Sequence, residues 1–345
     1  MRVGHITAIL IIAVLGVATL GVSQGRADDQ EKKALYDQKV LELKELTAKM
    51  QAPGITPDQY KELKAKYDQL SSEIDLLAKE LAQDKALQER QAAAKRAYNE
   101  GNTFAKTSRF EEALKAYDQA IAQDSSFAKA FYGRGLALAN LRRYDEALAA
   151  YQRAIALDPM YHEAYTALGN LYQKMGKYQD AVDVYTKAIN YNAQNAKAYY
   201  NLGTVYQNYL KDPARAVEAF RRATQIDPNY YQAFSSLGVA LADQGKPQEA
   251  ILAHETALAI NEKHFYSHYR LAELYNNVGR YQDALEAAEQ CLKYKEGYAP
   301  AQFEAGRAAE ALGDKAKALF YYELAAKDRR WAPAAQYHIE ELKKK

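Results

Sequence analysis

One stretch of 34 residues, lengthened once to 35, recurs seven times along this chain and limits the possible folds more than any other feature. A small residue, usually glycine, marks the period at Gly101, Gly135, Gly169, Gly203, Gly238, Ala272 and Gly306. Two further rows keep the same step, namely Ala113, Ala147, Ala181, Ala216, Ala250, Ala284 and Ala318, and Ala120, Ala154, Ala188, Ala223, Ala257, Cys291 and Ala325. Self-similarity at a period of roughly 20–50 residues is typical of solenoids and other repeat arrays.

Each repeat contains two helical patterns, which predicts a pair of antiparallel helices. Small residues at the crossing let the two backbones approach closely. One pair cannot bury its own apolar face, so neighbouring repeats must stack for the chain to be stable. We expect a larger side chain at Ala147 or Ala181 to overpack this crossing, at a cost of about 1–3 kcal/mol.

The three rows, together with Tyr165, Leu168 and Tyr172 in the first helix and Tyr185 in the second, resemble the tetratricopeptide repeat family. The resemblance implies an all-α fold, a right-handed α-solenoid of helix-turn-helix repeats. The seven expected repeats are 94–127, 128–161, 162–195, 196–230, 231–264, 265–298 and 299–332, followed by a C-terminal capping helix over 333–345. The extra residue of the fourth repeat precedes Asp212 and Pro213, which are expected to cap and begin a helix.

Residues 28–93 are charged and helical in period, and they predict a helical hairpin or coiled coil. After a break near Pro53, Thr56 is the expected N-cap, Pro57 the first helical residue and Gln59 the partner that completes a capping box. The second helix then carries an apolar seam at Tyr60, Leu63, Tyr67, Leu70, Ile74, Leu77 and Leu81. No strong helix breaker follows before Gly101, so this helix is expected to continue into the first repeat.

Two interpretations of the seam stand side by side. Either the hairpin only caps the solenoid, or the seam in 28–93 pairs with a second copy of the chain or with another protein. The second interpretation predicts self-association.

Residues 1–27 are typical of an export segment. Arg2 is followed by an uncharged apolar run over 6–22, and Gly25-Arg26-Ala27 has the small-x-small pattern of a cleavage point. We favour a cleaved signal peptide, with an uncleaved membrane anchor through 6–22 as the alternative. Both place the rest of the chain outside the cytoplasm, in the periplasm or an equivalent exported location.

Composition and motifs exclude several classes of function. With 46 basic and 44 acidic residues, the chain lacks the excess positive charge that nucleic-acid binding requires. Cys291 is the single cysteine, and its place in an alanine row indicates a buried structural thiol. His254, His264 and His268 lie close in sequence, but no cysteine or paired carboxylate completes a metal site. No nucleotide-binding loop or nucleophile elbow is present, so we predict neither catalytic residues, nor a metal, nor a cofactor.

The resemblance implies that partners bind on the inner, concave face, which the first helix of each repeat lines. A row of tyrosines with polar neighbours occupies the positions where family members contact ligands, and tyrosine offers both contact area and a hydroxyl group. The expected partner-binding residues are Tyr98, Asn102, Tyr132, Asn170, Tyr200, Asn201, Tyr266, Tyr269, Arg270 and Phe303. The alternative is that these tyrosines only shield the packing between repeats. We favour binding, because other residues already fill the packing positions of the repeat.

An export segment, a helical arm and repeats together favour a non-catalytic scaffold of the bacterial cell envelope that binds segments of other proteins. Two alternatives remain from the sequence. One is a structural protein that assembles with copies of itself, and the other is a regulator of a cell-envelope enzyme.

Overall fold

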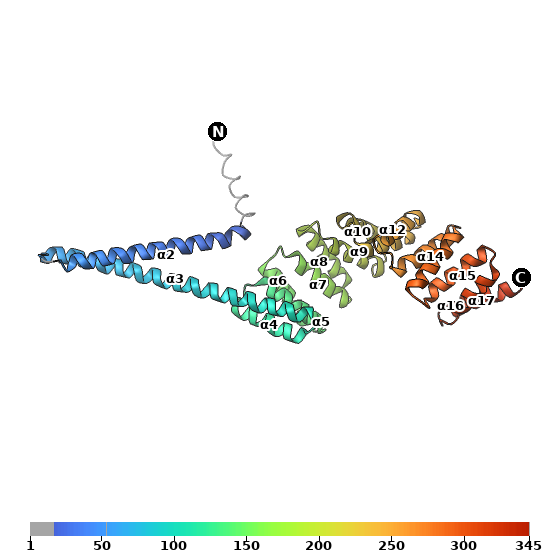
Figure 1. The fold of residues 1–345 in the computed structure, drawn as a ribbon, viewed down its shortest axis with the longest axis horizontal. Coiled ribbons are helices and arrows are strands. Elements are labelled where there is room, and N and C mark those ends of the chain that lie inside the picture. Colours follow the sequence, from blue (N-terminus) through green and yellow to red (C-terminus); the bar gives the residue numbers. More distant parts are fainter. Residues whose placement is uncertain (1–16, 53, 345) are drawn as a thin grey trace, which may run out of the picture. The chain divides into compact units, whose positions relative to one another are not determined.

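The computed structural model describes residues 17–52 and 54–344, and every regular element within them is an α-helix (Figure 1). The all-α prediction is therefore confirmed. The chain forms two compact units. The hairpin unit extends to Glu100 and includes Gln119–Ser125, whereas the repeat unit comprises Gly101–Asp118 and Ser126–Lys345.

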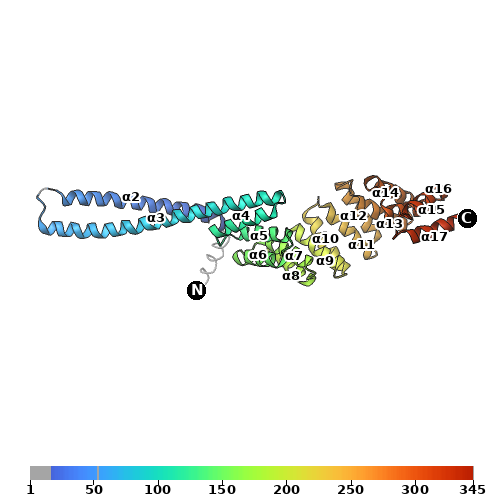
Figure 2. The same cartoon turned by 90° about the horizontal axis from the view of Figure 1, so that it is seen from below.

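The hairpin unit consists of α2 (Val17–Met50) and the greater part of α3 (Pro57–Lys106), which lie antiparallel (Figure 2). Leu70 and Ile74 of the predicted seam are buried, whereas Tyr60 near the turn is 46 % exposed. Ion pairs join the two helices, with 2.6 Å from Lys39 Nζ to Glu73 Oε2 and 2.8 Å from Lys32 Nζ to Asp84 Oδ2. The first helix thus covers much of the seam within one chain.

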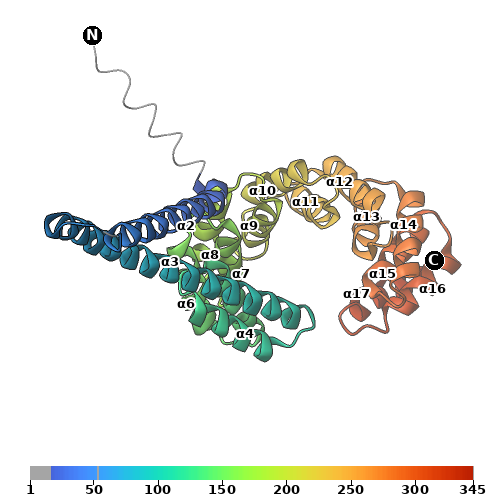
Figure 3. The ribbon, with the colours of Figure 1, turned by 60° about the vertical axis from the view of Figure 1, so that its left-hand side comes forward.

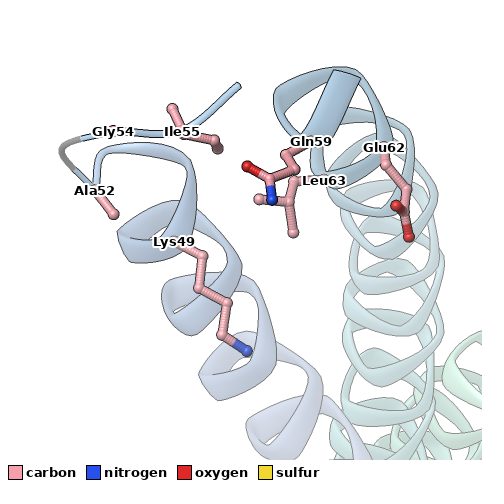
Figure 4. Close-up of a pocket in the computed structure, with 7 residues that line it drawn as sticks. All are labelled: Lys49, Ala52, Gly54, Ile55, Gln59, Glu62 and Leu63. Carbon is pink, nitrogen blue, oxygen red and sulfur yellow. The ribbon is translucent and has the colours of Figure 1, made fainter. Parts of the chain in front are cut away.

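The turn of the hairpin has the predicted capping box. The Thr56 backbone N–H donates to Gln59 Oε1 at 3.0 Å, and the Gln59 N–H donates to Thr56 Oγ1 at 3.3 Å. Figure 4 shows Gln59 and Leu63 beside the turn, in a hollow of about 420 Å3 between the two helix ends. Because both orphan donors are satisfied, the cap fixes where α3 begins.

The predicted export segment lies partly outside the described residues, which begin at 17. α2 continues from there through the predicted cleavage point near Ala27. Among the helices of residues 17–344, none is long and apolar enough to cross a membrane.

The repeat unit is a series of helix pairs. After the end of α3 and α4 (Phe110–Gln123), the pairs are α5 (Ala128–Asn140) with α6 (Tyr144–Leu157), α7 (His162–Lys174) with α8 (Tyr178–Tyr191), α9 (Ala196–Asn208) with α10 (Pro213–Ile226), α11 (Tyr231–Asp243) with α12 (Pro247–Ile260), α13 (Phe265–Asn277) with α14 (Tyr281–Tyr294), and α15 (Ala299–Ala311) with α16 (Lys315–Ala325). Figure 3 shows α11, α13 and α15 on the inner side of the curve that the repeat unit follows.

In each helix pair but one, an aromatic ring from the second helix packs directly against a glycine of the first helix. A Cβ atom added to Gly169 would lie 2.5 Å from Cε1 of Tyr185, whose side chain is fully buried. Only the bare glycine backbone leaves room for the ring. The same contact joins Gly101 to Tyr117, Gly135 to Tyr151, Gly203 to Phe220, Gly238 to His254 and Gly306 to Tyr322.

The sixth repeat is the exception, because it lacks both the glycine and the aromatic ring. Ala272 stands at the glycine position, and Ala288 stands where the other repeats have the ring. Both alanines are fully buried. A methyl group fits at position 272 because no ring needs that space.

The ends of the solenoid helices follow the predicted signals. Asp212 caps α10 by accepting the Arg215 N–H at 2.9 Å, and Pro213 is the first residue of that helix. The C-terminal helix α17 (Ala332–Lys344) buries Ala335 and Leu342 against the last repeat, as the sequence pattern predicts.

We predict that the glycine and the ring of one repeat are energetically coupled. Gly135→Ala alone should destabilise the protein by about 1–3 kcal/mol, because its methyl group overpacks against Tyr151. In a Tyr151→Ala background, which copies the natural Ala272 and Ala288 pair, the added methyl group should no longer be unfavourable. Urea unfolding of the wild type, the two single variants and the double variant measures the coupling. It would be contradicted if the two single changes in unfolding free energy add up to that of the double variant to within about 0.5 kcal/mol.

Candidate protein-binding groove

A cleft of about 290 Å3 opens on the face formed by the first helices of the second, third and fourth repeats. Its walls come from α5, α7, the start of α9 and the loop between α8 and α9. They are Tyr132, Leu136, His162, Glu163, Thr166, Ala167, Asn170, Asn192, Gln194, Asn195, Ala196 and Lys197. Two of the sequence-predicted residues, Tyr132 and Asn170, therefore lie in one cleft. The one acidic and one basic residue leave its lining without net charge at neutral pH if His162 is neutral.

Asn170 is held in one orientation within this cleft. Its Oδ1 atom accepts a hydrogen bond from the Tyr185 hydroxyl at 2.5 Å and another from Asn201 Nδ2 at 2.8 Å. Burial raises the pKa of Tyr185 well above its ordinary value, so the hydroxyl stays protonated and donates. With its oxygen doubly engaged, Asn170 presents its NH2 group, which has no partner among the described residues. A fixed donor of this kind binds a carbonyl oxygen without first reorienting.

Asn201 continues the arrangement one repeat further along. Because its Nδ2 donates to Asn170, its Oδ1 atom remains as an acceptor with no bonded partner in residues 54–344. A donor and an acceptor thus stand side by side on α7 and α9. The first repeat has a related contact, in which the Tyr117 hydroxyl donates to Asn102 Oδ1 at 2.7 Å.

A second set of hydrogen bonds holds the loop that forms the edge of the cleft. Asn195 Nδ2 donates to Thr166 Oγ1 at 3.1 Å, and Asn195 Oδ1 accepts from the Ala198 N–H at the start of α9. Asn192 Nδ2 lies 3.0 Å from Nε2 of His162. Our sequence analysis did not select these residues. Asn195 immediately before a helix is an N-cap signal that marks the loop as ordered.

The tyrosine row is more involved in packing than we expected. The Tyr132 ring lies 5.1 Å from Tyr161 and 6.1 Å from Tyr151, and Tyr200 lies 5.0 Å from Tyr230. Tyr269 similarly lies 5.5 Å from Tyr298. These rings therefore contribute to the packing between repeats, as the alternative interpretation predicts, and their part in binding stays a prediction. The last residue of each of these repeats folds back onto the row, and the spacing of the first helix does not reveal this.

The remaining predicted residues do not line the cleft. Tyr98 belongs to the hairpin unit, on α3. Tyr266 lies on α13, 5.9 Å from Tyr269, and Arg270 pairs with Glu273 on the same helix at 2.9 Å. Phe303 is packed against Trp331 and His338 at the start and in the middle of the C-terminal segment.

A polar network between α13 and α15 contains Glu304, the most buried Asp, Glu, Lys or Arg residue among the described residues. Glu304 is 4 % exposed, and its carboxylate is bonded by Asn276 Nδ2 at 2.8 Å and by Arg307 Nη1 at 2.9 Å. Burial raises the pKa of Glu304, although Arg307 and Asn276 act in the opposite direction. Arg307 balances the charge of Glu304, and Asn276 joins α13 to α15, while Asn276 Oδ1 is buried with no partner among the described residues.

The cysteine and the histidines that could have acted as a nucleophile or as metal ligands lie in packing positions. Cys291 is fully buried, and burial raises the pKa of its thiol to about 12, so the reactive thiolate does not form at neutral pH. His254 lies on Gly238, and His268 stacks on Tyr294. Within residues 17–52 and 54–344, no group of three or more His, Cys, Asp or Glu side chains is arranged to hold a metal ion.

Paired helices closed by small residues, with a polar cleft on the inner face, define a helical-repeat solenoid. Sequence profiles described as tetratricopeptide repeat match residues 98–161, 166–229, 206–264, 265–298 and 299–327, which together exceed half of the chain. The chain belongs to the tetratricopeptide repeat family. Proteins of this family act as scaffolds for protein–protein interactions and are generally non-catalytic.

Solved structures agree on the fold. The structure described as a functional characterisation of Pseudomonas aeruginosa PilF has a TM-score of 0.54 and 21 % identity, over 63 % of this chain and 98 % of its own. PilW, described as a type IV pilus biogenesis factor, has a TM-score of 0.51 and 21 % identity, over 61 % and 98 %. At this identity the likeness concerns the fold alone.

The curated relatives match only over short segments. A peroxisomal targeting signal receptor of Kluyveromyces lactis is 32 % identical over 82 residues, which are 24 % of this chain and 14 % of that protein. Human superkiller complex protein 3 is 30 % identical over 95 residues, or 27 % and 6 % of the two chains. The chain thus spans well under a fifth of the length of either relative.

We predict that Tyr185 and Asn170 stabilise the fold as a pair. Tyr185→Phe should cost about 1 kcal/mol through the lost hydrogen bond, and most of this cost should disappear in an Asn170→Ala background, where the longer contact of 3.3 Å to Gln173 Oε1 remains. Tyr151→Phe is the matched control, because Leu136 stands where Asn170 would accept the bond. Chemical unfolding gives the four energies. An equal cost for Tyr151→Phe would show that the hydroxyl, and not its bond to asparagine, matters.

Proposed function

We propose that this protein is a non-catalytic scaffold that binds an extended segment of another protein along the inner face of its repeats. The observation that carries this proposal is the fixed pair formed by Asn170 and Asn201. A peptide unit offers one carbonyl acceptor and one N–H donor. The free NH2 group of Asn170 and the free oxygen of Asn201 are the complementary groups, and both are held before a partner arrives.

The surroundings of the pair support main-chain recognition. Leu136, which is 37 % exposed, and the half-buried Tyr132 line the same cleft as Asn170 and supply apolar contact there. A volume of about 290 Å3 accommodates a side chain and part of its backbone, not a large cofactor. The relative from Kluyveromyces lactis is named as a receptor for a targeting signal, which is consistent with recognition of a protein segment by repeats of this kind.

Two parts of the proposal derive from the sequence. We propose that the protein is exported to the periplasm and serves in the bacterial cell envelope, because residues 1–27 have the pattern of a signal peptide. We also propose self-association through residues 28–93, as a second role. Its support is the set of leucines on the outside of the hairpin, Leu35, Leu41, Leu76 and Leu87, which are 43–60 % exposed.

One preparation from the envelope of the source cell tests both parts. We expect an intact mass that corresponds to a chain beginning near Asp28, and light scattering that gives more than one chain per particle. Retention of residues 1–27 in the membrane fraction would favour the anchor. A monomeric particle would overturn self-association without bearing on the groove.

Site-specific crosslinking tests the groove. A benzoylphenylalanine in place of Leu136 should capture one partner segment in source-cell extract, whereas the same residue at Leu252, which is 64 % exposed on α12, should not. Asn170→Ala combined with Asn201→Ala should reduce capture by about tenfold or more, equivalent to about 1.4 kcal/mol of binding free energy.

Circular dichroism at neutral pH must show that the double variant remains helical. Capture that is equal from Leu136 and Leu252, or that is unaffected by loss of both asparagines, would contradict the proposal. Alanine at Tyr132 or Tyr200 is a poorer test, because those rings also contribute to packing.

A further inference from the structure

Three histidines gather where the fifth repeat meets the sixth. His254 lies on α12, His264 directly precedes α13, and His268 lies on the first turns of α13. His254 is fully buried, His268 is 9 % exposed, and His264 is half-buried. We call these three residues the histidine seam. The binding function proposed above does not use them.

His254 occupies the ring position that Tyr185 and Phe220 hold in earlier repeats. Its Nε2 atom lies against the backbone of Gly238, where an added Cβ would be only 2.6 Å away. That nitrogen is buried and has no hydrogen-bond partner among the described residues. A proton there would therefore be left without an acceptor, which costs free energy in a buried site.

Ser267 fixes the neutral form of two of the rings. Its single hydroxyl proton is donated to Ser235 Oγ at 3.1 Å. Its oxygen then accepts from Nδ1 of His264 at 2.9 Å and from Nδ1 of His254 at 3.3 Å. Because Nε2 of His254 is buried without an acceptor, its neutral ring carries the proton on Nδ1, where Ser267 Oγ accepts it, and a further proton falls on the blocked Nε2.

The charges around the seam mostly oppose protonation. Arg270 on α13 and the neighbouring His264 face His254, and Lys293 on α14 faces His268. Among the described residues, the charge that favours a protonated ring is that of Glu262, in the loop before α13, whose backbone carbonyl also accepts from His268 Nε2 at 2.8 Å. His264 in turn faces His268, while the rings of Tyr231 and Tyr266 lie 5.1 and 6.4 Å from it.

We propose that the histidine seam makes the contact between the fifth and sixth repeats acid-sensitive, so that mild acid opens the solenoid at this place before any other. Opening exposes the three imidazoles to water. They become protonated there, whereas burial keeps them neutral in the closed state. Because α13 also carries Tyr266, Tyr269 and Arg270, opening alters the part of the inner face that these residues form.

The direction of the effect follows from proton linkage. Burial lowers the pKa of His254 to about 3 and also lowers those of His264 and His268. In the opened chain a histidine has its ordinary pKa of about 6.5. The closed seam is therefore fully stable above about pH 6.5, and its stability falls as the pH drops from there towards 3. For His254 alone, the opening equilibrium should rise about thirtyfold between pH 8 and pH 5.

Hydrogen exchange of the full chain, followed by mass spectrometry and corrected for the intrinsic pH dependence, tests this proposal. We expect exchange in α12 and α13 to rise by about thirtyfold or more at pH 5 relative to pH 8, while α5 to α8 change little. His254→Phe reproduces the contact of Phe220 with Gly203. It should remove the part of the acid-induced increase in exchange that comes from protonation of His254. His268→Tyr, which copies Tyr165 and Tyr199, should reduce it independently.

The proposal is overturned if the increase is uniform over all repeats, or if both variants retain the acid response of the wild type. Exchange at pH 8 shows whether each variant is folded, and the two substitutions lie on different helices, so that one remains informative if the other disturbs the fold. Groove crosslinking at neutral pH is a separate measurement, so failure of either idea is distinguishable from failure of the other.

Discussion

The contact of a ring with a bare glycine backbone sets the geometry on which the rest of the repeat unit depends. Because Gly169 has no side chain, the Tyr185 ring lies directly on α7, and its hydroxyl reaches past the crossing to Asn170. One residue thus packs the repeat and orients a polar group on its inner face. The closeness of the helices, which is a packing requirement, also determines where a partner finds a hydrogen-bond donor.

The order of the helices could be predicted from the sequence because repeat folds depend on local signals. The glycine and alanine rows gave the crossings, Thr56 and Gln59 gave the start of α3, and Asp212 with Pro213 absorbed the extra residue. These signals act within a few residues of where they occur. The amphipathic pattern of the last segment was sufficient in the same way, since α17 packs on the two helices of the repeat that directly precedes it.

The candidate site was less predictable, because it depends on contacts between residues 15 to 33 positions apart. The spacing alone placed Asn170 on the inner face, but not the two bonds that fix its amide. The extent to which the tyrosine row is packed could not be predicted for a similar reason. Tyr161 and Tyr230 end their repeats, and only the folded path of the chain brings them back onto Tyr132 and Tyr200. Position within a repeat predicts which face a residue occupies, not whether a neighbour already covers it.

The alanine pair of the sixth repeat constrains the route by which such a sequence can change. Replacing the glycine of a crossing first pushes a methyl group into the ring, whereas removing the ring first leaves a cavity that a methyl group then partly fills. A lineage that reaches the state of Ala272 and Ala288 without a steric clash must therefore lose the ring before it loses the glycine. The order of the two substitutions is therefore fixed, and returning to the pattern of the other repeats requires the same two steps in reverse order.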